Sequence, residues 1–189
     1  MLGNQKDPLT EIGEIIKKSA WPELKCGPAK PLPVSEKDFN SLLQRIALPE
    51  RAQELVRATI LLWHDHLDAA HQISQGIEDS DGSYVHGIVH RREPDYSNAK
   101  YWFHRVGTHP CFQGLAEKTA ALLREKGEKA LEDQLISRGQ WDPYAFIDVC
   151  QKAASRPNSD PQNQLLRQIQ ALEFELLVER FCDPITYAQ

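Results

Sequence analysis

The histidines of this chain are concentrated in one part of the sequence, since all seven lie between His64 and His109. In the first stretch, His64, Asp68 and His71 are separated by four and three positions. Side chains at these spacings project from one face of an α-helix. Residues 58–63 just before them are almost all apolar, which is typical of a buried helix. The polar groups that follow therefore need partners, because burying them unpaired is costly.

A second stretch, residues 83–93, repeats the pattern with His86, His90 and Glu93. His86 and His90 share a face in a helix and also in a strand, because four residues are two full strand periods. The connection between the two stretches is short, which favours antiparallel neighbours whose polar faces meet. Neutral imidazoles and carboxylates are ligands for Zn²⁺, Fe²⁺ or Mn²⁺. We therefore expect a divalent metal site built from His64, Asp68, His71, His86 and His90.

A metal ion at this place would activate a water molecule, and Glu93 would act as the general base. The predicted activity is that of a hydrolase or lyase acting on a small polar molecule. Arg91, Arg92 and Arg105 would hold a carboxylate or phosphate group of that molecule, since guanidinium groups bind such anions in forked geometry. The remaining predicted binding residues are His66 and Tyr84. His66 is two residues from His64 and lies on the apolar stripe of its helix.

Two other interpretations use the same residues. Without a metal, the pocket would bind an anionic small ligand, with an affinity that changes between about pH 5 and 8 because histidine titrates there. In the other, the histidines form a buried hydrogen-bonded network that only specifies packing, and Arg91 or Arg92 pairs with Glu93 or Asp95. A thiol nucleophile at Cys111, two residues after His109, is a further alternative, although nothing in the sequence indicates a lowered thiol pKa.

Residues 60–112 carry two long histidine-rich strings, HDHLDAAHQISQ and HGIVHRREPDYSNAKYWFHRVGTHP. This block resembles that of an uncharacterised family of bacterial and fungal proteins. The resemblance implies a helical fold and brings no activity with it. The string ATILLWHD (58–65) is also similar to the His-Asp dyad of the HD-domain metal phosphohydrolases, with His64 and Asp65 as the dyad. That family has a metal-binding histidine on an earlier helix and a Gly and a Lys after the dyad, and this chain has none of these.

The apolar spacing predicts helices almost throughout. They fall at residues 7–20, 35–46, 50–75, 83–93, 97–106, 115–126, 128–136, 143–154 and 161–181. Residues 27–34 contain three prolines and predict an extended connector. We therefore expect a single all-α domain over residues 1–189, with seven to nine helices and a Pro-rich N-terminal connector. The helix at 161–181 has a second apolar set, which predicts a homodimer contact. That set consists of Leu166, Phe174, Leu177 and Phe181.

Composition narrows the function classes. The 189 residues carry a net charge of −5, and residues 60–110 have seven acidic against four basic side chains, which argues against nucleic-acid binding. No stretch reaches the roughly 18 apolar residues of a membrane span. The N-terminus shows no secretory signal, and the four cysteines form no Cys-x-x-Cys pair. These features predict a soluble cytoplasmic protein with free thiols.

Overall fold

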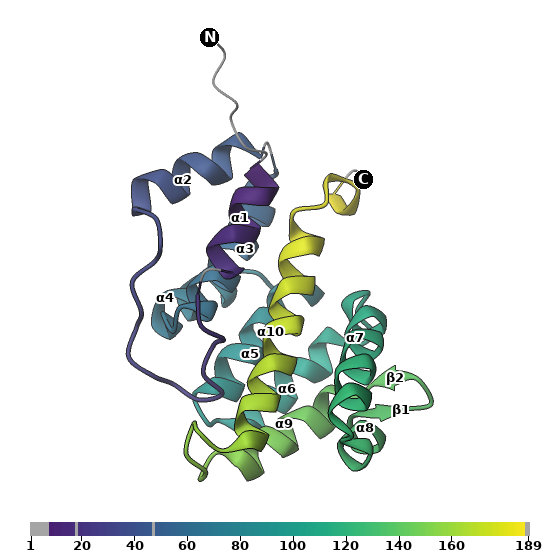
Figure 1. The fold of residues 1–189 in the computed structure, drawn as a ribbon. Coiled ribbons are helices and arrows are strands. Elements are labelled where there is room, and N and C mark those ends of the chain that lie inside the picture. Colours follow the sequence, from purple (N-terminus) through teal and green to yellow (C-terminus); the bar gives the residue numbers. More distant parts are fainter. Residues whose placement is uncertain (1–7, 18, 47, 188–189) are drawn as a thin grey trace.

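A computed structural model describes residues 8–17, 19–46 and 48–187, and within these residues the chain forms ten α-helices and one small hairpin (Figure 1). The helices are α1 (Pro8–Lys17), α2 (Glu36–Arg45), α3 (Glu50–Trp63), α4 (Leu67–Ser74), α5 (Ser80–Arg92), α6 (Tyr96–Val106), α7 (Cys111–Lys126), α8 (Lys129–Leu135), α9 (Pro143–Ala153) and α10 (Pro161–Phe181). Strands β1 (Ile136–Ser137) and β2 (Gln140–Trp141) pair antiparallel, and a 3-10 turn (Pro184–Tyr187) follows α10. The all-α fold is thus confirmed.

Helix starts follow the local capping chemistry. Ser35 caps α2: its hydroxyl accepts a hydrogen bond from the Asp38 amide at 3.1 Å and donates one to the Asp38 carboxylate at 2.6 Å. Asp142 and Asp160 cap α9 and α10: each carboxylate accepts hydrogen bonds from two backbone amides of the first turn, and each residue is followed by a proline. A proline is tolerated there because its missing N–H would have no partner within the helix.

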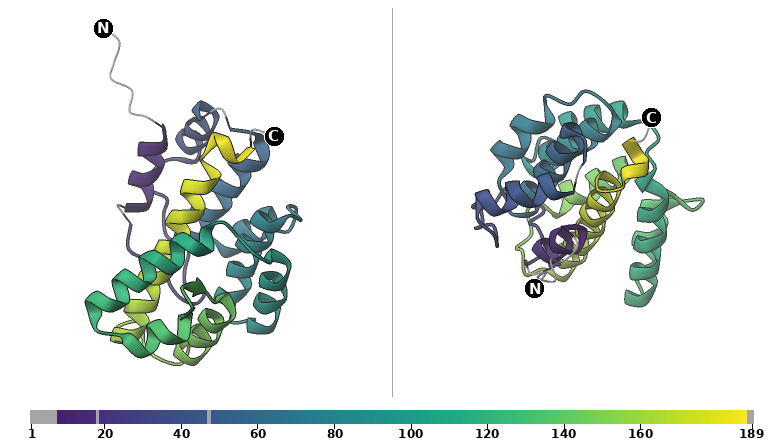
Figure 2. Two further views of the ribbon diagram at one scale, coloured as in Figure 1. Left: turned by 90° about the vertical axis from the view of Figure 1, so that its right-hand side faces the viewer. Right: turned by 90° about the horizontal axis from the view of Figure 1, so that it is seen from above.

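The last long helix, α10, joins two clusters of buried side chains. One cluster lies among α1 to α6, and the other lies among α7, α8, α9 and the hairpin. Figure 1 shows α10 running between these parts, and the view from above in Figure 2 shows the same division. The second apolar set of α10, which suggested a homodimer contact, is fully buried within one chain. These four side chains are therefore not available for a contact with a second copy, and the homodimer stays a prediction.

The predicted helix over residues 50–75 is wrong in one respect, because it is broken between Trp63 and Leu67. This break accounts for ten helices where at most nine were expected. Asp65 has a φ of +65°, a left-handed conformation that L-residues adopt rarely but aspartate tolerates better than most. Its carboxylate turns inward to the Arg92 guanidinium, and Lys30 Nζ lies 2.7 Å from it. The break is thus held by long-range ion pairs.

The proline-rich segment 27–34 has neither helix nor strand, as expected, and it crosses the break between α3 and α4. The Lys30 amide donates to the His64 carbonyl at 2.8 Å, which ties the two segments together. Among the helices of the described residues, none combines the length and apolar character needed to cross a membrane.

Candidate metal centre

Helix α5 presents two histidines on one face. The Asp79 side chain caps this helix by accepting from the Gly82 amide at 3.0 Å. His86 and His90, one turn apart, stack with ring centroids 4.8 Å apart and planes inclined by 21°. Both are buried. The predicted pairing of these two side chains is therefore confirmed on a helix.

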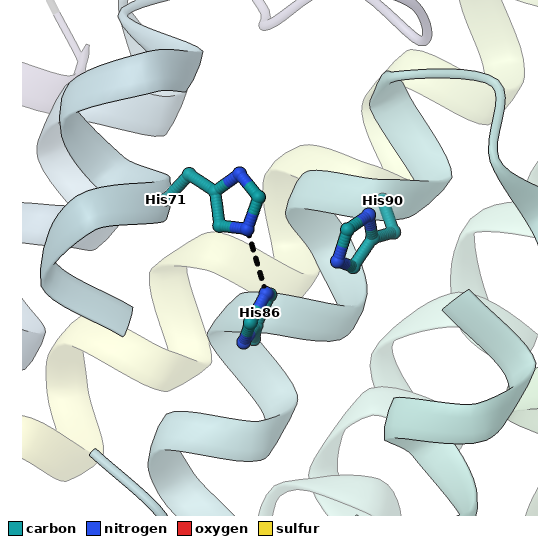
Figure 3. Close-up of side chains that lie close together, drawn as sticks. All are labelled: His71, His86 and His90. Atoms are coloured by element: carbon teal, nitrogen blue, oxygen red, sulfur yellow. Dashed lines mark hydrogen bonds between the residues drawn. The ribbon is translucent and has the colours of Figure 1, made fainter. Parts of the chain in front are cut away.

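The third histidine, His71, comes from α4. Its Nε2 lies 2.9 Å from Nε2 of His86, and its ring centroid lies 5.0 Å from that of His90. One nitrogen from each of the three rings can be chosen so that all lie within 4.8 Å of one another. Figure 3 shows the His71 ring reaching from its helix toward the two rings on the neighbouring helix. The two stretches thus turn imidazoles toward each other, as expected from the sequence.

Glu93, the C-cap residue of α5, supports two of the rings from the side. One of its carboxylate oxygens lies 3.1 Å from Nδ1 of His90, and the other lies 3.6 Å from Nδ1 of His71. A carboxylate on Nδ1 fixes the tautomer that leaves Nε2 with a free lone pair, the arrangement common around metal-bound histidines. The Asn98 amide also contacts His90 Nε2 at 3.1 Å, so an ion bound there would replace that hydrogen bond.

The His86 ring is covered by Trp102 of α6, whose ring stacks on it with centroids 3.9 Å apart. The Arg105 guanidinium carbon lies over the Trp102 ring, 4.9 Å from the ring centroid. Among the described residues, Nδ1 of His86 is buried without a hydrogen-bond partner. As a purely hydrogen-bonded network the cluster is therefore incomplete, because an unmatched buried polar atom is costly.

Both α5 imidazoles are uncharged at neutral pH. Burial, together with the neighbouring His90, His71 and Arg105, lowers the pKa of His86 to about 3. Burial also lowers the pKa of His90, against the opposing effect of Glu93. The neutral imidazole is the form with a lone pair for a metal ion.

The spacing of the nitrogens is close to what a tetrahedral zinc site needs. Zn–N bonds of about 2.0–2.1 Å place ligand nitrogens about 3.3 Å apart. The His71 and His86 nitrogens, 2.9 Å apart, already approach this separation. The 4.8 Å limit on the set of three leaves at most about 1.5 Å to close by side-chain rotation. Three imidazoles would hold such an ion and leave one of its four positions for water, and the His71 side chain is about a third exposed (32%).

Two expected ligands, His64 and Asp68, are not part of this cluster. The break after Trp63 places His64 in another direction from His71, and His64 Nε2 lies 3.5 Å from the Ser19 hydroxyl. Burial lowers the pKa of His64 to about 4. Asp68 is exposed on α4. Their predicted role as metal ligands is wrong, because the i, i+4, i+7 spacing requires an unbroken helix. The same break separates the His64–Asp65 dyad from the three rings.

Arg91 and Arg92 do not line an anion pocket. Arg91 is 1% exposed, and its guanidinium donates to Glu173 at 2.5 Å and to Gln170 at 3.1 Å. Arg92 is fully buried and donates to the Asp65 carboxylate and to the Leu62 carbonyl. Both guanidinium groups are thus used inside the protein. The expected alternative of internal pairing is correct in kind, although the partners are distant residues and not Glu93 or Asp95.

The other expected binding residues lie around the cluster or away from it. His66 Nε2 lies 2.7 Å from the Lys30 carbonyl and serves the segment that crosses the helix break. Tyr84 is fully buried between Phe103 and His109, and burial together with the Glu173 charge raises the pKa of its hydroxyl. Arg105 is exposed beside the Trp102–His86 stack. Of these three, only Arg105 is close to the imidazoles.

A second polar cluster surrounds Asp81, and no local sequence pattern predicted it. His109 Nε2 and Arg180 Nε lie 3.0 and 2.8 Å from one carboxylate oxygen of Asp81, and Arg51 Nη2 lies 3.0 Å from the other. Burial would raise the pKa of Asp81, but the hydrogen bonds from His109, Arg180 and Arg51 hold it well below its usual range. Burial raises the pKa of the neighbouring Cys111 thiol to about 12, which favours the protonated thiol over the thiolate that a nucleophile requires.

No family model matches the chain, and no curated protein or solved structure matches it at a significant level. The resemblance of residues 60–112 to a histidine-rich family therefore stays a prediction. The function has to be argued from the site itself.

Proposed function

We propose that this protein binds one divalent transition metal ion through His71, His86 and His90. Zn²⁺ is the ion of first choice, because it accepts three imidazoles in a tetrahedral set and imposes no other geometry. The observation that carries the proposal is the set of three ring nitrogens within 4.8 Å of one another on two adjacent helices. Two of these rings are neutral at pH 7 because of their lowered pKa values.

Glu93 supports the same proposal. Its carboxylate lies beside Nδ1 of both His71 and His90, which orients the rings for an ion on the other nitrogen. The carboxylate also compensates part of the positive charge that the ion brings into a partly buried place. This second role is electrostatic and does not require direct coordination.

We further propose that the bound ion acts as a hydrolase or lyase centre for a small polar molecule. Three protein ligands leave a fourth position for water, whose pKa an ion of this kind lowers to about 7. Glu93, 29% exposed beside the cluster, is the group that would take a proton from that water. The substrate is not held by Arg91 or Arg92, because both are committed to internal pairs.

Zinc binding is tested by isothermal titration and elemental analysis of protein made without a histidine tag. We expect one equivalent of Zn²⁺ for the wild type and an affinity loss of at least about 100-fold for His71→Ala. His71 is the ligand to remove because 32% of its side chain is exposed, so the fold should tolerate the substitution. The matched control is His104→Ala, which removes an exposed histidine outside the cluster.

Two outcomes contradict the metal site: less than about 0.1 equivalent of zinc after loading, or the same zinc affinity in His71→Ala as in His104→Ala.

The catalytic part is tested separately with p-nitrophenyl acetate and p-nitrophenyl phosphate. A zinc-dependent rate that Glu93→Gln lowers supports it. A zinc-loaded protein with no rate above the free ion on either compound rejects the catalysis and leaves the binding site standing.

A further inference from the structure

A second candidate site lies at the other side of α6. Small-molecule pockets have volumes of roughly 300–1,000 Å³, and the cavity here has a volume of about 680 Å³. It is enclosed by the end of α6, the start of α7, the β1–β2 hairpin and the start of α9, which lie on the α7 side of the molecule in Figure 1. None of its lining residues belongs to the three-histidine cluster.

Aromatic rings make up much of the cavity wall. Phe103 and Phe112 contribute from α6 and α7, and Trp141 and Tyr144 contribute from the hairpin and α9. Phe103 and Trp141 are anchored in the two buried clusters, with exposures of 1% and 5%. Such rigid, flat surfaces stack well against a planar ligand and lose little entropy when they do so.

The charge of the cavity is one-sided. Among the described residues that line it, Glu117 is the only carboxylate and there is no lysine or arginine. Two histidines also line it: both ring nitrogens of His109 are used, one by Asp81 at 3.0 Å and the other by the Cys111 amide at 3.2 Å, whereas His104 is exposed at the rim. The lining thus offers an anionic ligand no lysine or arginine, whereas a cation would be attracted by Glu117 and by the ring faces.

One polar group of the wall has no partner within the described part of the chain: the Trp141 indole N–H is buried without an acceptor. The exposed side chains of Thr108 and Gln140 also line the cavity. Gly107 turns the chain at the rim with a φ of +63°, and open space lies where its Cβ would be. The rim thus offers donors and acceptors next to an apolar floor, which is the usual composition of a small-molecule site.

We propose that this cavity binds a planar nitrogen heterocycle that is uncharged or cationic. The rings of Phe112, Trp141 and Tyr144 would stack on it, and Glu117 would accept from its N–H groups or balance its charge. The arginines in the sequence suggested a negatively charged carboxylate or phosphate ligand, whereas this ligand class is uncharged or positively charged. The inference is independent of the metal site.

Three probes of the same shape and different charge test it: 1-methylquinolinium, quinoline and quinoline-6-carboxylate, each titrated into the full chain at pH 7. We expect binding of the cation and the uncharged probe, and binding of the anion weaker than that of the cation by about tenfold or more. Glu117→Gln should reduce this preference to about threefold or less, and Glu125→Gln, a charge change near the far end of α7, should leave it unchanged.

Filling the cavity gives a second readout. Gln113 lines it from the exposed side of α7, so Gln113→Trp should abolish binding of the cation without affecting the fold. Gln164→Trp, at an exposed position of α10, is the matched control and should bind as the wild type does. Equal affinity for the three probes, no binding of any of them, or binding that survives Gln113→Trp would each overturn the proposal.

Discussion

His64 should make the stability of this protein fall on mild acidification. The side chain is 1% exposed, and its pKa is lowered to about 4, first by burial and then by the charges of His66 and Lys30, with Asp65 opposing. In the unfolded chain the ring regains an ordinary pKa of about 6.5. The unfolded state therefore takes up a proton at a pH where the folded state does not.

The sign and the magnitude follow from this difference. A depressed folded-state pKa gives stability that is fully present above about pH 6.5 and is lost as the pH falls toward the folded value of about 4. Between pH 7 and pH 5, the proton uptake by the unfolded state alone lowers the free energy of unfolding by about 2 kcal/mol. His71, His86 and His90 do not enter this difference when a matched variant is compared.

Urea unfolding of metal-free protein at pH 7, 6 and 5 measures the effect, with His64→Gln as the variant because an amide does not titrate. The readout is the change in the free energy of unfolding with pH, because this change does not depend on the stability from which the variant starts at pH 7. We expect this change to be smaller in the variant by about 2 kcal/mol. Parallel falls of the two proteins, within about 0.5 kcal/mol, would show that His64 is not held neutral by its surroundings.

Three other changes have defined outcomes. Asp65→Asn leaves the buried guanidinium of Arg92 with an uncharged partner and should lower the free energy of unfolding, measured in urea, by about 3–5 kcal/mol. The exposed control Asp68→Asn should change this free energy by no more than about 0.5 kcal/mol. Equal effects of the two substitutions would contradict the buried pair. Glu93→Gln keeps all three histidines but should weaken zinc binding by about 10- to 100-fold in calorimetry, and an unchanged affinity would remove its supporting role. Asp81→Asn should flatten the loss of stability below about pH 4, because the lowered pKa of this carboxyl contributes stability above its ordinary pKa that is lost in acid; an unchanged acid limb in circular dichroism would contradict this.

The part of the site that could be predicted from the sequence is the part fixed by local geometry. His86 and His90 share a face in either regular structure, so their pairing did not depend on the secondary-structure assignment. His71 was expected to meet them because the connection between the two stretches is short. The cap at Ser35 and the helix starts at Pro143 and Pro161 could likewise be predicted, because they depend only on neighbouring residues.

The errors come from contacts between residues far apart in the chain. No glycine or proline marks the break after Trp63, which is held by the pairing of Asp65 with Arg92 and Lys30. Arg91 finds its partner Glu173 at a distance of 82 positions, which no local pattern can reveal. Arg91 and Arg92, two of the three arginines that suggested an anion pocket, are therefore used in internal ion pairs.

X-ray absorption at the zinc K-edge of the zinc-loaded protein tests the three-histidine site most directly. The account predicts nitrogen or oxygen neighbours at about 2.0–2.1 Å, with the outer-shell scattering of three imidazoles, reduced to two in His71→Ala. A spectrum with one imidazole or none, or with a sulfur neighbour at about 2.3 Å, would contradict the assignment of the metal to His71, His86 and His90.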